Sequence, residues 1–163
     1  MRASARITAA DLDALRIVSP ALAIGGVCVV AGGLLAAVTA SHPAQPTTWA
    51  SAYLVLVAGA SQVALAACQA LLAHRPVPRP LLLTQVLAWN AGNVAVLGGT
   101  LSHVTALVDL GGILLVIALA IAGGLTLRPV QGRTVTLRVF RGLVALLVVS
   151  IPVGLWLARL GAS

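Results

Sequence analysis

The chain has 163 residues, of which 60% are hydrophobic and only 8% charged, and its net charge is +7. A soluble domain carries about 25% charged residues because its surface faces water, so this composition excludes an ordinary soluble protein. Aromatic residues make up 3% of the chain and the basic residues are spread over separate segments. Single-strand nucleic-acid binders instead combine a basic groove with stacking aromatic side chains. We therefore expect no nucleic-acid partner.

The apolar residues form five long blocks. An apolar run of about 18 or more residues is typical of a membrane-spanning helix, whereas the strands of a membrane barrel alternate over about ten residues. Lipid accepts only these two backbone structures. The sequence therefore predicts an all-α integral membrane protein, a bundle of about five transmembrane helices. Their predicted ranges are 17–39, 53–73, 81–100, 104–125 and 143–160.

The arginines predict the orientation of these spans. Nine of the ten arginines lie before span one, between spans two and three, or between spans four and five, three regions that five antiparallel spans place on the same side of the membrane. The tenth, Arg159, lies at the end of span five, on the opposite side. Cytoplasmic loops collect arginine, so the amino terminus is predicted inside and the carboxyl terminus outside. The use of arginine without lysine is typical of a GC-rich genome. The predicted location is the cell membrane, in a bacterium with such a genome.

The chain divides into a cytoplasmic amino-terminal segment, 1–16, and a five-helix transmembrane domain, 17–160. In the segment, Thr8 is followed three residues later by Asp11, a capping-box pattern, which predicts a short interfacial helix. Span one ends in small residues that resemble a signal-peptide cleavage site, although it is longer than the apolar region of about 7–15 residues in signal peptides. Cleavage would leave four spans in the same orientation.

The most basic connection is the segment RPVQGRTVTLRVFR, residues 128–141, predicted on the inner side. The anionic lipids of the inner leaflet attract basic residues by about 1 kcal/mol each. We therefore expect this segment to lie on the membrane surface as a loop. Docking of a cytoplasmic partner is the alternative.

The stretch TQVLAWNAGN, residues 84–93, carries many hydrogen-bonding side chains between apolar flanks. Because consecutive spans run antiparallel, the depths of their residues can be compared. Amides from spans two and three and one acid from span four then fall into three pairs at similar depth: Gln62 with Asn90, Gln69 with Gln85, and Asn93 with Asp109. Interhelical hydrogen bonds between such groups average about 0.6 kcal/mol. The simplest interpretation is a polar ladder that joins helices, and a polar route through the membrane is the alternative.

Asp109 is the one acidic residue within the predicted spans. A carboxylate at the centre of a membrane helix costs about 2.5–3.5 kcal/mol on insertion scales, and intramembrane acids often mark proton or ion paths. Asp109 is predicted near the outer end of span four, with no basic residue at its depth. Three states stay open: a protonated carboxyl that donates to Asn93, a carboxylate that reaches outer water, or a pair with an arginine of another protein.

Small residues recur on one face of span one, where Gly25, Cys28, Gly32 and Ala36 follow at spacings of three, four and four. Such residues let helix backbones approach closely. The spacing predicts close helix packing, either within the bundle or in a homodimer.

No pattern of catalytic, metal-binding or cofactor-binding residues is present in the sequence. Cys28 and Cys68 lie inside predicted spans without zinc-ligand spacing. The histidines, His42, His74 and His103, lie at the ends of spans, where paired haem ligation across spanning helices is not expected. We therefore predict no metal, no cofactor and no enzymatic activity.

Two functions stay open. The first is a structural or accessory membrane protein, whose partners are the bilayer, anionic inner-leaflet lipids and a second copy or a larger membrane complex. The second is a small transporter or proton-coupled carrier that uses Asp109 and the ladder of Asn and Gln side chains. Small residues, few polar loops and the lack of a water-exposed site favour the first.

Overall fold

The computed structural model describes the backbone of residues 9–72, 78–125 and 134–160, and the side chains of 16–72, 78–124 and 136–149 within them. These residues contain helices and no strand. In chain order the elements are α1 (Ala9–Thr39), α2 (Gln45–Tyr53), the π-helix η1 (Leu54–Ala60), α3 (Ser61–Leu72), α4 (Arg79–Leu101), α5 (Thr105–Leu125) and α6 (Thr134–Leu160).

Four stretches among the described residues are long and apolar enough to cross a membrane: Arg16–Thr39, Gln45–Leu72, Arg79–Leu101 and Thr105–Gly124. The prediction of an all-α protein with several such helices is confirmed for these four. The fifth predicted span, 143–160, lies within α6, and its passage through a membrane stays a prediction.

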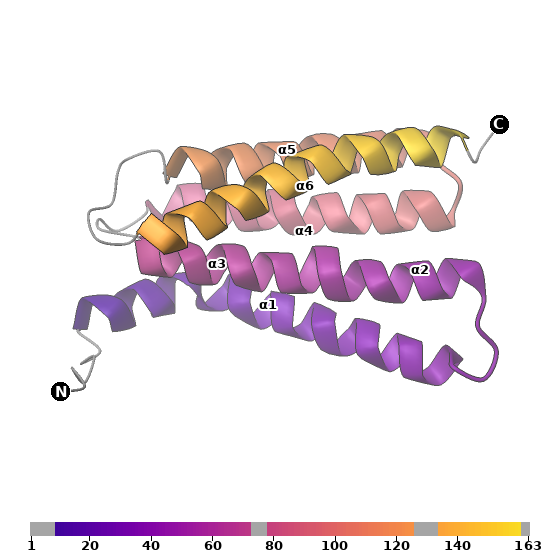
Figure 1. Ribbon diagram of the computed structural model, residues 1–163, viewed down its shortest axis with the longest axis horizontal. Helices are drawn as coiled ribbons and strands as arrows, with labels where there is room; N and C mark the ends of the chain where they lie inside the picture. Colours follow the sequence, from indigo (N-terminus) through magenta and orange to yellow (C-terminus); the bar gives the residue numbers. More distant parts are fainter. Residues whose placement is uncertain (1–8, 73–77, 126–133, 161–163) are drawn as a thin grey trace.

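The helices run back and forth along one axis (Figure 1). α1 packs along the continuous helix formed by α2, η1 and α3, and α4 packs along α5. α6 crosses over this arrangement and contacts both α3 and α5, so it joins the two hairpins. The main core lies where α3, α4, α5 and α6 meet, around Leu65, Trp89, Leu115, Leu119 and Phe140.

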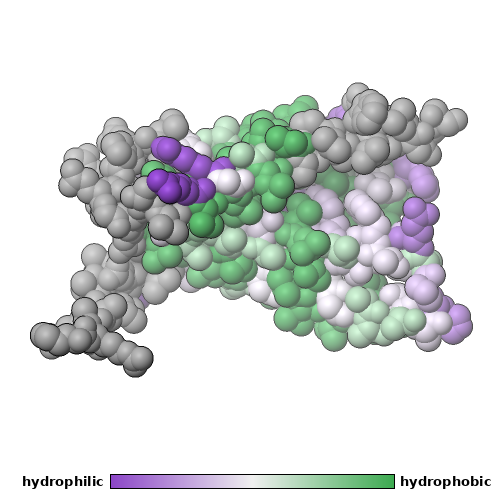
Figure 2. All heavy atoms as spheres, viewed as in Figure 1, coloured by the Kyte–Doolittle hydropathy of each residue, from purple (hydrophilic) through white to green (hydrophobic). Residues whose placement is uncertain are grey.

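The bundle is apolar outside and partly polar inside. Large apolar side chains are exposed, among them Val27 at 67%, Leu87 at 68% and Val94 at 71%, whereas Gln62 and Asn93 are only 4% and 3% exposed. Soluble proteins distribute these residue types the other way round. Figure 2 shows an apolar middle zone with hydrophilic residues towards both ends of the long axis. This is the surface expected of a protein surrounded by lipid.

The predicted interfacial helix and the first span form one helix, α1, which contains Pro20. A proline has no N–H, so it removes the backbone hydrogen bond to the carbonyl four residues earlier, here that of Arg16. The hydroxyl of Ser19 donates to this same carbonyl oxygen at 2.8 Å. The side chain thus replaces the backbone donor, and the helix continues through the proline.

The second span begins at Gln45, eight residues before the predicted start at Tyr53. The polar start of this helix lowers its hydropathy, but Pro46 at its first turn favours helix initiation. The middle of the span is the π-helix η1, which the apolar sequence did not predict. At its end the backbone N–H and the hydroxyl of Ser61 both donate to the carbonyl of Leu56.

The prediction that 128–141 is a loop is wrong for its second half. Residues 128–133 lie outside the described residues, but α6 begins at Thr134 and runs without interruption into the last predicted span. Phe140 is 1% exposed and Leu147 is 6% exposed, and both belong to the main core. Their spacing of seven residues puts them on one face of the helix. Packing of this face outweighs the basic character that suggested a surface loop.

Part of the predicted small-residue stripe lies in the seam between α1 and the second span. Gly25 and Gly32 are buried there. A Cβ added to Gly32 would lie 2.8 Å from the carbonyl oxygen of Ser51, closer than van der Waals contact allows. The other members of the stripe are less buried, since Cys28 is half-buried and Ala36 exposed.

α4 ends in a Schellman motif that turns the chain into α5. The N–H of Val104 donates to the carbonyl of Gly99 at 2.8 Å, and the N–H of His103 to that of Thr100 at 3.4 Å. This motif requires a left-handed residue after the helix cap, and His103 has φ 58°. Residues other than glycine adopt this conformation at a cost of about 1 kcal/mol.

We therefore expect His103→Gly to raise the free energy of unfolding by about 0.5–1 kcal/mol, because glycine adopts this conformation without strain. Equilibrium unfolding in lipid bicelles would measure the change. Ser102→Gly is the matched control: Ser102 has φ −94°, so its replacement should lower stability. An equal effect of both substitutions would contradict the strain at His103.

Candidate functional site

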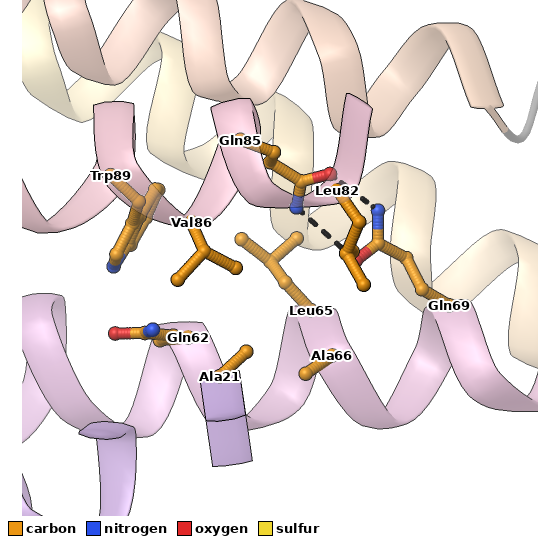
Figure 3. Close-up of a pocket in the computed structure, with 9 residues that line it drawn as sticks. All are labelled: Ala21, Gln62, Leu65, Ala66, Gln69, Leu82, Gln85, Val86 and Trp89. Carbon is orange, nitrogen blue, oxygen red and sulfur yellow. Dashed lines mark hydrogen bonds between the residues drawn. The ribbon is translucent and has the colours of Figure 1, made fainter. Parts of the chain in front are cut away.

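The centre of the candidate site is an amide pair between α3 and α4. Nε2 of Gln69 donates to Oε1 of Gln85 at 2.9 Å, and Nε2 of Gln85 donates back to Oε1 of Gln69 at 3.2 Å (Figure 3). The two side chains are 4% and 7% exposed. Each amide thus donates one hydrogen bond to the other and accepts one from it. The two residues are 16 positions apart in the sequence, and their bonds join α3 to α4.

Three other polar residues of α4 bond to their own helix. Thr84 donates to the carbonyl of Pro80, Asn90 to that of Val86 at 2.8 Å, and Asn93 to that of Trp89 at 2.8 Å. Each carbonyl lies four residues earlier, where a short side chain can reach back along the helix. Hydrogen bonds within one helix satisfy these donors without a partner helix.

The predicted ladder is shown at its Gln69–Gln85 rung and is wrong at its Gln62–Asn90 rung, while the Asn93–Asp109 rung stays a prediction. Among the described residues, neither polar atom of the buried Gln62 amide has a hydrogen-bond partner, so Gln62 does not bond to Asn90. Oδ1 of Asn93 also accepts no hydrogen bond from the described residues, so the donation from a protonated Asp109, one of its three predicted states, is not formed there. Matching residues by depth ignores the direction in which each side chain leaves its helix, and short Asn side chains prefer the nearby carbonyl.

Trp89 connects α4 to the π-helix. Its indole is 3% exposed, and Nε1 lies 3.5 Å from the carbonyl oxygen of Ala58 in η1. This distance is at the long end of the hydrogen-bond range. A π-helix is rare and often marks a functional position, and here it lies against the single aromatic side chain of α4.

A small cavity lies between α1, α3 and α4 (Figure 3). The space open to the centre of a water molecule is about 10 Å³, roughly what one water molecule requires. Apolar side chains form much of its wall, and the polar groups on it come from Gln62, Gln69, Gln85 and Trp89. The complete lining is Ala21, Gln62, Leu65, Ala66, Gln69, Leu82, Gln85, Val86 and Trp89.

Asp109 and Asn90 do not line this cavity. Asp109 is half-buried near the start of α5, and Asn90 is half-buried on α4. Of the six predicted polar residues, the structure brings Gln62, Gln69 and Gln85 together around one space. Among the described residues no group of three His, Cys, Asp or Glu side chains could hold a metal ion.

Comparison with protein-family models, with curated proteins and with solved structures finds no match to this chain. Function is therefore inferred from the residues and their packing.

Sequence reasoning missed two contributors to the site. Ala21 of α1 closes one wall of the cavity, and the carbonyl of Ala58 faces the Trp89 indole. A backbone carbonyl and an alanine carry no signal of their own in a sequence. Trp89 lies within the polar stretch 84–93, whose interpretation rests on its amides, although a buried indole N–H usually finds an acceptor.

The Gln69–Gln85 pair predicts strong energetic coupling. Gln69→Leu leaves the Gln85 amide buried without its partner, and we expect the free energy of unfolding to fall by about 1–3 kcal/mol. The double variant with Gln85→Leu should lose less than the sum of the two single variants. A double-mutant cycle in bicelles would measure the coupling, which we expect at about 1–3 kcal/mol for two bonds of up to about 1.7 kcal/mol each.

Thr84→Val is the control for this cycle, because Thr84 is exposed and bonds only to its own helix. It should change stability by less than about 0.5 kcal/mol and show no coupling to Gln69. If the coupling energy between Gln69 and Gln85 is as small as that between Gln69 and Thr84, their two hydrogen bonds do not stabilise the bundle.

Proposed function

We propose that this chain is a structural or accessory protein of the cell membrane, a five-span bundle that associates with itself or with a larger membrane complex. Its amino terminus lies inside and its carboxyl terminus outside. Support for membrane insertion comes from the reversed surface, with exposed Leu87 and Val94 and buried amides.

The observation that carries the accessory role is the internal use of the polar groups. Gln69 and Gln85 bond to each other, and Asn90 and Asn93 donate to their own helix. The cavity beside them has room for about one water molecule, too little for a transported solute. These features favour a bundle stabilised by its polar groups over one that passes a substrate along them.

Native mass spectrometry of the full chain, extracted gently from its own membrane, tests this role. We expect a defined complex, either with a second protein or with further copies of the chain. A monomer that carries a solute across the membrane of reconstituted vesicles without another protein would overturn the proposal.

The carrier alternative depends on Asp109 and has its own test. A proton-coupled carrier should lose pH-dependent uptake in vesicles when Asp109 is replaced by Asn, whereas an accessory protein should retain its complex with this variant. Uptake that is unchanged in Asp109→Asn would exclude a carrier mechanism built on this carboxyl.

Orientation can be tested separately with single cysteine variants. Ser41 and Ser102 are exposed in the turns after α1 and α4, and Arg79 is exposed at the start of α4. In intact cells a membrane-impermeant maleimide should label Ser41→Cys and Ser102→Cys, and it should label Arg79→Cys only after permeabilisation. A chain without Cys28 and Cys68 provides the background, and the reverse labelling pattern would invert the proposed topology.

A further inference from the structure

Gln62 is the most unusual polar residue of the bundle. Its side chain is 4% exposed, and neither Nε2 nor Oε1 has a hydrogen-bond partner among the residues that the structure describes. A primary amide offers two donors and one oxygen acceptor with two lone pairs. Burial of such a group without hydrogen bonds costs about 1–3 kcal/mol, and surrounding lipid supplies no donor or acceptor. Gln62 therefore requires a partner other than the described residues of the chain.

The cavity against Gln62 determines the size of that partner. It has about 10 Å³ open to the centre of a water molecule, which is about one water. No charged residue lines it, so a metal ion or a charged solute would lack a counter-charge. A neutral, hydrogen-bonding molecule of the size of water fits both limits.

The polar groups around the cavity provide enough bonds for one water molecule. A buried water usually makes about three hydrogen bonds. The Gln62 amide can donate one and accept one, and the Trp89 N–H and the Ala58 carbonyl add a further donor and a further acceptor. Figure 3 shows the Gln62 amide and the indole nitrogen of Trp89 at the same end of the cavity.

Trp89 provides an independent indication. Its N–H is 3.5 Å from the Ala58 carbonyl oxygen, a long and weak contact, so the same N–H can also donate to a water molecule beside it. The carbonyl belongs to η1, and Gln62 follows the end of η1 by two residues. One water molecule at this place can contact α3 through Gln62 and α4 through Trp89.

We propose that this cavity is a binding site for a single buried water molecule, held by Gln62 and Trp89, that joins α3 to α4 beside the π-helix. It is a second polar link between these helices, next to the Gln69–Gln85 pair. The site stands independently of the accessory role.

Solid-state NMR of the full chain in lipid bilayers, with nitrogen-15 in Gln and Trp side chains, tests the proposal. Magnetisation transferred from water protons should reach Nε2 of Gln62 and Nε1 of Trp89. The Trp89 signal is assigned by its loss in Trp89→Phe. Trp49, half-buried near the start of α2, is the control for ordinary interfacial water.

Gln62→Met removes the amide at similar side-chain length, and we expect it to abolish the transfer from water to Trp89 while Trp49 is unaffected. Retention of the Gln69 and Gln85 side-chain signals would show that the variant is folded. Ala66→Val narrows the cavity with Gln62 in place and should reduce the transfer to Gln62. If Gln62 and Trp89 receive no magnetisation from water while Trp49 does, the water site is refuted; unchanged transfer to Trp89 in Gln62→Met would equally refute the role of Gln62.

Discussion

Phe140→Ala is expected to lower the free energy of unfolding by about 3–5 kcal/mol, the largest effect of any substitution considered for this bundle. Phe140 is 1% exposed and packs in the main core with Leu115 and Leu119. Truncation leaves a cavity whose lining loses its van der Waals contacts. Because α6 contacts mainly α5 and α3, we expect this loss to loosen α6 from the bundle.

Equilibrium unfolding in bicelles would measure the stability of this variant, and limited proteolysis would report on the attachment of α6. Val139→Ala is the matched control, because Val139 is the preceding residue and is 58% exposed. It should change stability by less than about 0.5 kcal/mol. If both substitutions have the same effect, Phe140 does not anchor α6 and the placement of this helix against α3 and α5 is wrong.

Gly32→Val is expected to have the second-largest effect, a loss of about 3 kcal/mol, because extra atoms in a tightly packed seam force backbone shifts that cost about 1–3 kcal/mol and occasionally more. A Cβ at this position would lie 2.8 Å from the Ser51 carbonyl oxygen and 2.9 Å from Cβ of Leu54. Both are close to the helix axis and cannot rotate away. We expect α1 to separate from the second span.

Gly33→Val is the control at the neighbouring position, where an added Cβ would meet nothing within 4 Å. It should leave stability unchanged or raise it slightly, since glycine is a poor residue in a helix interior. Unfolding in bicelles measures both variants, and a disulfide between cysteines introduced on α1 and α2 would report their separation. A larger loss for Gly33→Val than for Gly32→Val would reverse the assignment of the packed face of α1.

The small residues of α1 show how much about helix packing can be predicted from a sequence. The spacing from Gly25 to Gly32 indicated a face of α1 that could approach another helix. It did not identify the partner, which is the second span of the same chain. A homodimer remains a proposal and would require another surface of the chain, because Gly25 and Gly32 are buried within the bundle.

Of the three predicted pairs of the polar ladder, the structure shows Gln69 with Gln85 and contradicts Gln62 with Asn90. Gln69 and Gln85 have long side chains that reach across from adjacent antiparallel helices, so similar depth was enough to bring them together. Asn90 and Asn93 have shorter side chains that reach their own backbone instead. The state of Gln62 could not be predicted, because it depends on how far α3 is rotated about its axis after the π-helix.

The apolar runs alone predict helices of membrane-spanning length and their approximate places in the chain, because lipid offers the backbone no hydrogen-bond partner. The residues at which those helices begin, such as Gln45 and Thr134, and the side of each helix that faces a neighbour depend on tertiary packing. Hydropathy averages over a helix and carries no information on its rotation. The cavity lined by Gln62 and Trp89 and the packed face of α1 both depend on how each helix is rotated about its axis. That rotation is fixed by contacts with side chains that are distant in the sequence.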